Sequence, residues 1–458
     1  MNADERPSAY HTSCNRHLLE VVPASALHIL DVGCAEGRLG EALKRQDPTR
    51  TVFGIEREPS VAARAAGRLD RVFAIDVEAE IPPLEPGSLD CILYGDVLEH
   101  LVDPEAVLRR CRTLLAPGGI ILCSVPNAQH HSVLAALARS DFQYTDAGLL
   151  DVGHLRFFTY STIIKLLLDA GFAPAIVADV PIPASQARLK ALIPFLTHLG
   201  LHPERTRRYL DAYQYIVRGD LLPYTDEANS GNSEAEQPLS FVVCASDEAT
   251  LESNLLASPC LREPVGHEVL AIRGCPNAAA GLNRGLASAT HDLVVCVHQD
   301  VYLPRGWPAR FLAQYREAKR ALGPIGVAGV YGVSLVDGAV QRAGRVVDRD
   351  RLLSEKPALP TEVDTLDELL LAVPKSTPFQ FAPSLGFHLY GADICLAARQ
   401  QGLKAVALDA LCFHHSKSVG LPPAFRPSAE VFARKWAKQL PIATSCVLFD
   451  VQGRMRVI

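Results

Sequence analysis

The stretch that decides the fold of the first half is Leu27 to Gly40, LHILDVGCAEGRLG. The apolar run from Ile29 to Val32 predicts a buried strand, and Arg38 to Lys44 has the spacing of a helix. Gly33 and Gly37 lie between them, where a tight turn requires backbone angles that other residues rarely adopt. In an open α/β sheet this turn lies at the carboxyl edge of the first strand, where small molecules bind. The stretch therefore predicts an α/β domain with a ligand at this turn.

Carboxylates beside the turn indicate which ligand it binds. Asp31 and Glu36 would repel a pyrophosphate, which prefers a fuller glycine motif and a helix N-terminus without negative charge. Glu56 ends the next predicted strand, about 20 residues after the turn, where a carboxylate can bond both hydroxyls of a ribose. These acids favour S-adenosylmethionine, which combines an ammonium group with a ribose.

Further polar residues follow the third and fourth predicted strands. Asp76 ends RVFAID, from where its side chain can reach an adenine amino group, and Asp96 follows SLDCILYG. His100 is either a general base near the methyl acceptor or a structural histidine that opens the next helix. His154, in GHLRFFT, is expected to be structural. The expected cofactor-binding residues are Asp31, Gly33, Gly37, Glu56, Asp76 and Asp96, with His100 as the catalytic candidate.

Taken together, these motifs resemble class I S-adenosylmethionine-dependent methyltransferases. The resemblance covers residues 10–222 and rests on DVGCAEGRLG, GIERE, AIDVE, LYGDVLEHLVDP, LLAPGGIILCSVPN and GHLRFFTYSTIIKLLLDAGF. It implies a Rossmann-like domain over residues 1–222. Ala35 departs from the pattern, because the family commonly has glycine there. A basic helical insertion at about residues 183–210 is expected to cover the acceptor pocket, to form a dimer face or to lie on a membrane surface.

Composition limits the remaining possibilities. A chain of 458 residues predicts two domains, and the polar, acidic segment 223–238 is expected to link them. The net charge of -6 gives no electrostatic footprint for nucleic acid. No apolar window approaches the roughly 20 residues of a membrane span, and the twelve cysteines form no CxxC pair. We expect a cytoplasmic protein without a transmembrane segment, whose oligomeric state the sequence leaves open.

The second half restarts with a buried strand, LSFVVCAS, as a new α/β sheet would. Its most informative segment is LVVCVHQD, a strand that ends in Asp300. A carboxylate at this position, beside a nucleotide diphosphate, is the arrangement that holds Mg²⁺ or Mn²⁺. Such a cation stabilises the leaving diphosphate of a transfer reaction.

This half resembles family 2-type glycosyltransferases of the GT-A fold, close to a branch that includes a streptomycin-biosynthesis glycosyltransferase. The resemblance covers residues 239–430 of a domain expected at 239–458 and rests on HQDVYLPRGW, VDTLDELLL, FHLYGADICL and FHHSKS. It implies that Asp300 binds the metal, that Asp393 is the catalytic base, at the Asp of the family's ED motif, and that His414 or His415 contacts the metal. His298 and Gln299 stand where many relatives have a further acid, and Ala392 replaces the usual glutamate.

The sequence therefore predicts a bifunctional transferase. It would transfer a methyl group from S-adenosylmethionine and, with inversion, a sugar from a nucleotide-sugar donor, acting on a glycan or a glycosylated small molecule. The altered HQD and GAD motifs support an alternative, in which the second half is a degenerate glycosyltransferase-like module used for binding or scaffolding.

Overall fold

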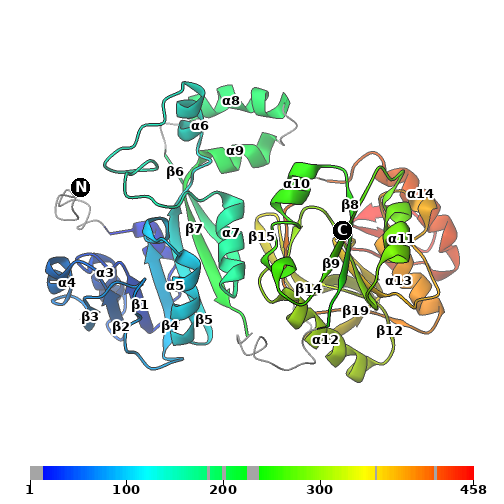
Figure 1. The fold of residues 1–458 in the computed structure, drawn as a ribbon, viewed down its shortest axis with the longest axis horizontal. Helices are drawn as coiled ribbons and strands as arrows, with labels where there is room; N and C mark the ends of the chain where they lie inside the picture. The colour runs from blue at the N-terminus through cyan, green and yellow to red at the C-terminus, as the bar shows by residue number, and fades with distance from the viewer. Residues whose placement is uncertain (1–13, 183–185, 199–202, 224–236, 356–357, 417–419) are drawn as a thin grey trace. The chain divides into compact units, whose positions relative to one another are not determined.

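The computed structural model describes residues 14–182, 186–198, 203–223, 237–355, 358–416 and 420–458. Its contacts divide the chain into two units, Met1–Pro223 and Tyr224–Ile458, drawn in Figure 1. Residues 224–236, most of the expected linker, lie outside the described residues. Among the described residues, every helix is too short or too polar to cross a membrane.

Unit 1 contains a seven-stranded sheet in the order β3-β2-β1-β4-β5-β7-β6. The first five strands are parallel, and β7 runs antiparallel to β5 and β6. The strands are β1 (His28–Val32), β2 (Thr51–Ile55), β3 (Arg71–Phe73), β4 (Leu89–Gly95), β5 (Leu115–Pro126), β6 (Phe172–Pro181) and β7 (Ala212–Leu221). Because the strand order reverses at β1, the carboxyl end of β1 lies at the switch point where such sheets bind ligands.

The α-helices of unit 1 are α2 (Arg16–Val21), α3 (Arg38–Gln46), α4 (Pro59–Ala65), α5 (Pro104–Cys111), α6 (His131–Ala138), α7 (Tyr160–Asp169), α8 (Gln186–His198) and α9 (Pro203–Asp211). Helices α8 and α9 lie between β6 and β7, within the segment expected as a helical insertion. The third strand is shorter than predicted, because β3 ends at Phe73. Asp76 lies instead in the following turn, where its backbone oxygen accepts hydrogen bonds from Ala79 N and Glu80 N.

The larger sheet of unit 2 has the order β16-β19-β12-β18-β10-β8-β9, in which β18 is antiparallel to both neighbours. Its strands are β8 (Ser240–Ala245), β9 (Glu268–Arg273), β10 (Leu293–Val297), β12 (Ile325–Gly329), β16 (Thr361–Val363), β18 (Leu370–Pro374) and β19 (Lys404–Ala407). The helices of this unit are α10 (Glu248–Ser253), α11 (Ala278–Ser288), α12 (Trp307–Leu322), α13 (Tyr390–Gln400) and α14 (Phe425–Lys435).

A second sheet of unit 2 has the order β11-β20-β14-β13-β17, with β15 paired to β14. These strands are β11 (Val301–Tyr302), β13 (Tyr331–Val336), β14 (Ala339–Asp348), β15 (Arg351–Ser354), β17 (Thr365–Leu366) and β20 (Phe413–His414), and a small third sheet contains β21 (Ile442–Ala443), β22 (Val447–Phe449) and β23 (Met455–Val457). In the register of the second sheet, His414 pairs with Val301 of β11 and with Asp348 of β14. The main chain thereby brings residues from three distant segments together.

Candidate active sites

The glycine turn of unit 1 has the conformation that its sequence predicts. Gly33, Ala35 and Gly37 have φ angles of 70°, 47° and 77°, all in the left-handed region. A Cβ atom on Gly33 would also lie 2.6 Å from Cγ2 of Val97, so both conformation and space require glycine there. Ala35 adopts the left-handed conformation at a cost of roughly 1–2 kcal/mol, which explains why glycine is common at this position in the family it resembles.

Two carboxylates lie beside the turn. Glu56 accepts hydrogen bonds from Ala35 N at 3.1 Å and from Glu58 N at 2.9 Å, so its side chain is held against the turn. Asp31 is 3% exposed. Burial, together with the charge of Glu56, raises the pKa of Asp31 to about 7. Two neighbouring acids of this kind suit a ligand that brings a positive charge.

Asp96 and Asp76 follow the neighbouring strands. The Asp96 carboxylate accepts hydrogen bonds from Asn15 Nδ2, at 3.2 Å, and from Gln214 Nε2. Burial raises the pKa of Asp96 to about 6, although these hydrogen bonds favour the charged form. Asp76 is exposed and accepts a hydrogen bond from Glu78 N at 2.9 Å. Because β1 to β4 are adjacent and parallel, the sheet places Asp31, Glu56 and Asp96 along one edge, with Asp76 further out.

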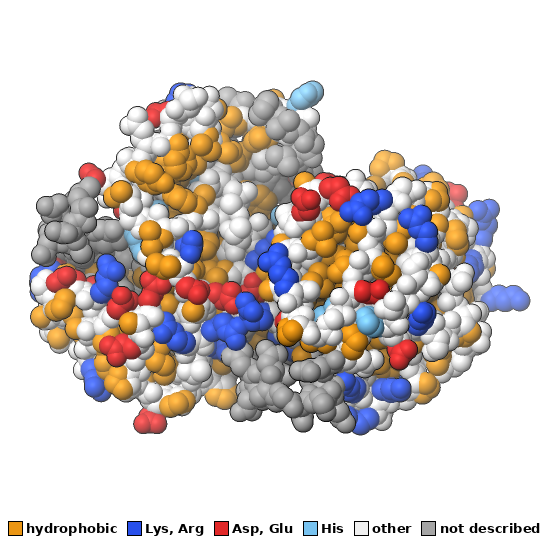
Figure 2. Space-filling view, viewed as in Figure 1, with side chains coloured by type: hydrophobic (Ala, Val, Ile, Leu, Met, Phe, Trp, Pro, Cys, Tyr) orange, Lys and Arg blue, Asp and Glu red, His pale blue; other side chains and the backbone are white. Residues whose placement is uncertain are grey.

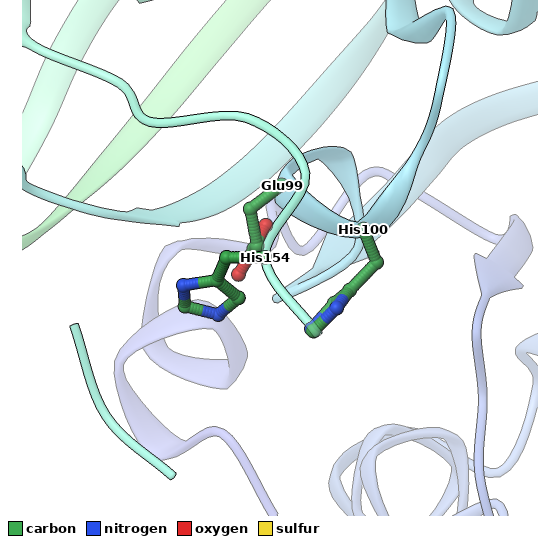
Figure 3. Close-up of side chains that lie close together, drawn as sticks. All are labelled: Glu99, His100 and His154. Atoms are coloured by element: carbon green, nitrogen blue, oxygen red, sulfur yellow. The ribbon is translucent and has the colours of Figure 1, made fainter. Parts of the chain in front are cut away.

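A second group in unit 1 combines Glu99 and His100 of the 3₁₀ helix η2 (Leu98–His100) with His154 from the segment before α7. Figure 3 shows the three side chains converging, and one potential ligand atom from each lies within 4.8 Å of the others. The backbone oxygen of Glu99 accepts hydrogen bonds from Leu155 N at 2.8 Å and from Arg156 N at 3.0 Å, which fix the later segment beside η2.

Two members of this second group are not among the site residues predicted from the sequence. His154, expected to be structural, stands next to His100, with ring centroids 4.9 Å apart. Glu99 is not among the predicted site residues, although it is 1% exposed and burial raises its pKa well above the usual range. An acid directly before His100 was the signal in the sequence, but nothing there indicated which distant residue would join it.

In unit 2, Asp300 lies beside His298 and His414. One potential ligand atom from each is within 4.8 Å of the others, and His414 Nε2 is 3.5 Å from Asp300 Oδ1. On its other side His414 Nδ1 is 2.8 Å from Asp348 Oδ1. Despite burial, which acts in the opposite direction, the bonds to Asp300 and Asp348 raise the pKa of His414 to about 10. Burial would raise the pKa of Asp300, but His414 and His298 hold it well below its usual range.

Of the two predicted histidine ligands, only His414 brings its side chain into the group with Asp300, whereas the backbone N–H of His415 donates to the Asp300 backbone oxygen at 2.8 Å. The ring of His415 stacks on Phe413, and its Nδ1 lies 3.3 Å from Oδ1 of Asn254, so its side chain takes a different direction. His298 joins the group instead, and its Nε2 lies 2.8 Å from the Tyr390 hydroxyl. The sequence alone could not identify His298 as a member, because the family pattern has an acid near that position.

Asp393 is fully buried. It is the fourth residue of α13, not the residue that caps it, which is Leu389. Its Oδ1 accepts a hydrogen bond from Trp436 Nε1 at 2.8 Å and pairs with Lys435 Nζ at 2.6 Å. In this placement Asp393 joins α13 to the end of α14. Asp300 and, more weakly, Asp367 are the acids that act electrostatically on His298.

Comparisons with known proteins agree with the two-part architecture. A family model described as a methyltransferase domain matches residues 8–175, and one described as a glycosyltransferase like family matches residues 240–422. The ubiquinone biosynthesis O-methyltransferase of Psychrobacter arcticus is 34% identical over 152 residues, which are 31% of this chain and 58% of that protein. The protein of the same name from Dinoroseobacter shibae is 32% identical over 165 residues, 35% of this chain and 65% of the relative.

The chain thus spans about three fifths of the length of these curated relatives. A solved structure of a SAM dependent methyltransferase from Archaeoglobus fulgidus aligns with 43% of this chain and 86% of its own, at 16% identity and a TM-score of 0.31. The two matched segments lie one in each unit. This α/β protein therefore joins a Rossmann-like methyltransferase domain to a glycosyltransferase-like domain.

Proposed function

We propose that this protein is a bifunctional transferase, which methylates an acceptor with S-adenosylmethionine and glycosylates one with a nucleotide-sugar donor. The acceptors would be glycans or glycosylated small molecules, in keeping with the resemblance of the second half to the streptomycin-biosynthesis branch. The observation that carries the proposal is the left-handed glycine turn with Asp31 and Glu56 held beside it. It is supported by the group formed by His298, Asp300 and His414 in the other domain.

In the methyltransferase domain, each residue has a separate task. Gly33 and Gly37 allow the main chain to approach the ligand closely, and Glu56 bonds the ribose hydroxyls. Asp31 and Asp96 form the acidic edge that receives the ammonium group, and Asp76 reaches the adenine. S-adenosylmethionine supplies the methyl group when it is bound. In the simplest mechanism for a hydroxyl acceptor, His100 accepts its proton, a contribution of typically 10²–10⁴-fold.

In the glycosyltransferase-like domain, we propose that Asp300, His298 and His414 hold Mn²⁺ or Mg²⁺. The carboxylate and two imidazoles are chemically suited to such an ion, which would stabilise the leaving diphosphate. Inversion also requires a base on the opposite side of the sugar, the role that the motif gives to Asp393. For Asp393 to act in this way, its pairing with Lys435 and Trp436 would have to open. Its burial favours the alternative, in which this domain binds a glycan or acts as a scaffold.

The cysteines bear on where the protein works. All twelve lie within the described residues and are unbridged thiols. Because disulfides form in oxidising compartments, this supports the cytoplasmic location that we propose.

Hydrolysis of nucleotide sugars by the full chain, with and without Mn²⁺, separates the two possibilities for the second domain. We expect hydrolysis that depends on Mn²⁺ and is lost in Asp300→Asn, whereas the exposed-site control Glu362→Gln keeps it. A catalytic domain is rejected if a panel of UDP-, dTDP- and GDP-sugars shows binding without Mn²⁺-dependent turnover. That result would show that the second domain is a binding module.

A further inference from the structure

We propose that Glu99, His100 and His154 form a divalent-cation site in the methyltransferase domain, at which the methyl acceptor binds through its hydroxyl oxygens. The inference rests on the methyl transfer proposed above. It begins with an unusual carboxylate. Glu99 is 1% exposed, and its Oε2 has no hydrogen-bond partner among the described residues. Figure 3 shows this carboxylate pointing toward the ring of His154.

A buried carboxylate without compensation is costly. The charged groups that face Glu99 make the cost greater, because Asp96 and Asp151 are both acids that act on it. A cation bound between Glu99 and the two imidazoles would offset the negative charge of this region and supply the partner that Oε2 lacks.

The histidines are oriented as ligands usually are. His100 Nδ1 lies 2.9 Å from the backbone oxygen of Gly153, and His154 Nδ1 lies 3.3 Å from that of Leu149. A carbonyl oxygen only accepts, so each Nδ1 carries the proton and each Nε2 has the lone pair. Metal-binding histidines characteristically donate their second N–H to a carbonyl or carboxylate in this way, which fixes the tautomer and the ring.

The donor set indicates the kind of ion. One carboxylate and two imidazoles supply three ligands and leave further coordination positions open, as in metal sites that bind a substrate. Imidazole suits first-row transition ions, and carboxylate also suits Mn²⁺. We therefore assign the site to Mn²⁺ or Zn²⁺ rather than Ca²⁺, whose ligands are oxygens alone.

The open positions indicate the acceptor class. Two neighbouring hydroxyl oxygens on a ring, a vicinal diol or a catechol, fit adjacent positions on one ion. Exposed apolar side chains gather near His154: Phe157 lies 6.3 Å from its ring and 6.2 Å from Phe142, which in turn lies 5.9 Å from Tyr144. Figure 2 shows that hydrophobic side chains are common on one face of unit 1. Such side chains offer flat faces to a ring.

The cation changes the role of His100. As a metal ligand, His100 is no longer the general base. Instead, the ion would lower the pKa of the acceptor hydroxyl bound to it, as metal ions do for bound water. The hydroxyl proton passes to solvent. The oxygen then forms a bond to the methyl carbon as the bond from that carbon to the sulfonium breaks, giving a methyl ether and S-adenosylhomocysteine.

The test measures binding of Mn²⁺ alone, and separately of Zn²⁺ alone, to the chelator-treated full chain. Because Asp300 lies in the other proposed metal site, all measurements use the Asp300→Asn background. We expect one ion per chain there, and at least tenfold weaker binding after Glu99→Gln or His154→Ala, the effect typical of disturbed metal sites. Glu105→Gln, in which the changed acid lies on the surface of α5, is the control and should bind normally.

Calorimetry with S-adenosylmethionine on the same proteins separates the two proposals. If S-adenosylmethionine binds normally but the parent protein binds no ion, the metal site alone is overturned. The same conclusion follows if folded Glu99→Gln and His154→Ala bind the ion as tightly as the parent protein. Loss of cofactor binding in the parent protein overturns the proposed methyl transfer. Thermal melting identifies a variant that has unfolded. Ion binding by the other, folded variant then tests the metal site.

Discussion

Raising the pH from 5.5 to 7.0 should tighten the binding of S-adenosylmethionine, and Asp31 should contribute the largest part of this effect. Burial and the charge of Glu56 raise the pKa of Asp31 from 3.8 to about 7. The carboxyl is therefore mostly protonated at pH 5.5 in the unliganded protein. A ligand that carries an ammonium group favours the ionised carboxylate, so a proton must leave when it binds.

The magnitude follows from the pKa. If only the form with ionised Asp31 binds, affinity is reduced about 33-fold at pH 5.5 and about twofold at pH 7.0, which gives a difference of about 16-fold, or roughly 1.6 kcal/mol. Both pH values lie below the range in which an α-amino group loses its own proton. Asp31 alone should release nearly one proton on binding at pH 5.5, and about half of one at pH 7.0.

The stability of the unliganded protein should change in the opposite direction. Because the folded pKa of Asp31 is raised, its contribution to stability is fully present below pH 3.8 and is lost as the pH rises toward 7. The same titration thus weakens the fold and strengthens ligand binding. Opposite pH dependences of stability and affinity over one pH range are the signature of a buried acid that must ionise when the ligand binds.

Calorimetry in two buffers with different ionisation enthalpies measures the affinity and the proton release together. The comparison protein is Asp31→Asn, which keeps the shape of the side chain and cannot titrate. Its affinity is expected to be low and to depend on pH less steeply than that of the parent protein, because Asp96, whose pKa burial raises to about 6, still titrates. If Asp31→Asn shows the same pH dependence and proton release as the parent protein, the assignment of the titration to Asp31 is wrong.

Two further predictions concern single carboxylates. Glu56→Ala should weaken S-adenosylmethionine binding by about 1–3 kcal/mol, the scale of charge-assisted hydrogen bonds, whereas Glu58→Ala should leave calorimetric affinity unchanged; equal affinity in all three proteins would remove Glu56 from the ribose site. Asp393→Ala should lower the free energy of unfolding by roughly 1–3 kcal/mol in denaturant titrations, because Trp436 Nε1 loses its buried acceptor. Unchanged stability, combined with lost nucleotide-sugar hydrolysis, would support Asp393 as a catalytic residue.

Much of the fold follows from local pattern. The turn from β1 to α3 could be predicted because glycine spacing and an apolar run are local signals, and the structure places left-handed residues at Gly33 and Gly37. The end of the third strand could not, because the apolar residues Ala74 and Ile75 continue the pattern beyond Phe73. Hydrogen bonds of the turn that begins at Asp76 determine the path of the chain there, and propensity alone does not reveal them.

The side chains of the sites were harder to assign, since partners lie far apart in sequence. Trp436, which binds Asp393, is 43 residues away from it in the chain. The family motif identified Asp393 as a candidate, but the packing of the end of α14 determines where its carboxylate points. His415 illustrates the same limit, because strand pairing directs the neighbouring His414 to Asp300.

The two histidine-containing groups share a physical cause. In each, a residue that follows a central strand meets a histidine from a distant segment, and main-chain hydrogen bonds hold that segment in place. Leu155 N and Arg156 N bind the backbone oxygen of Glu99 in one domain. In the other, β11 pairs with β20 beside Asp300. Because these main-chain bonds do not depend on the side chains that form the groups, replacing Glu99 or Asp300 should remove a ligand without moving its partners. Loss of metal binding in such variants can therefore be assigned to the missing ligand atom, and unchanged binding would count directly against the site.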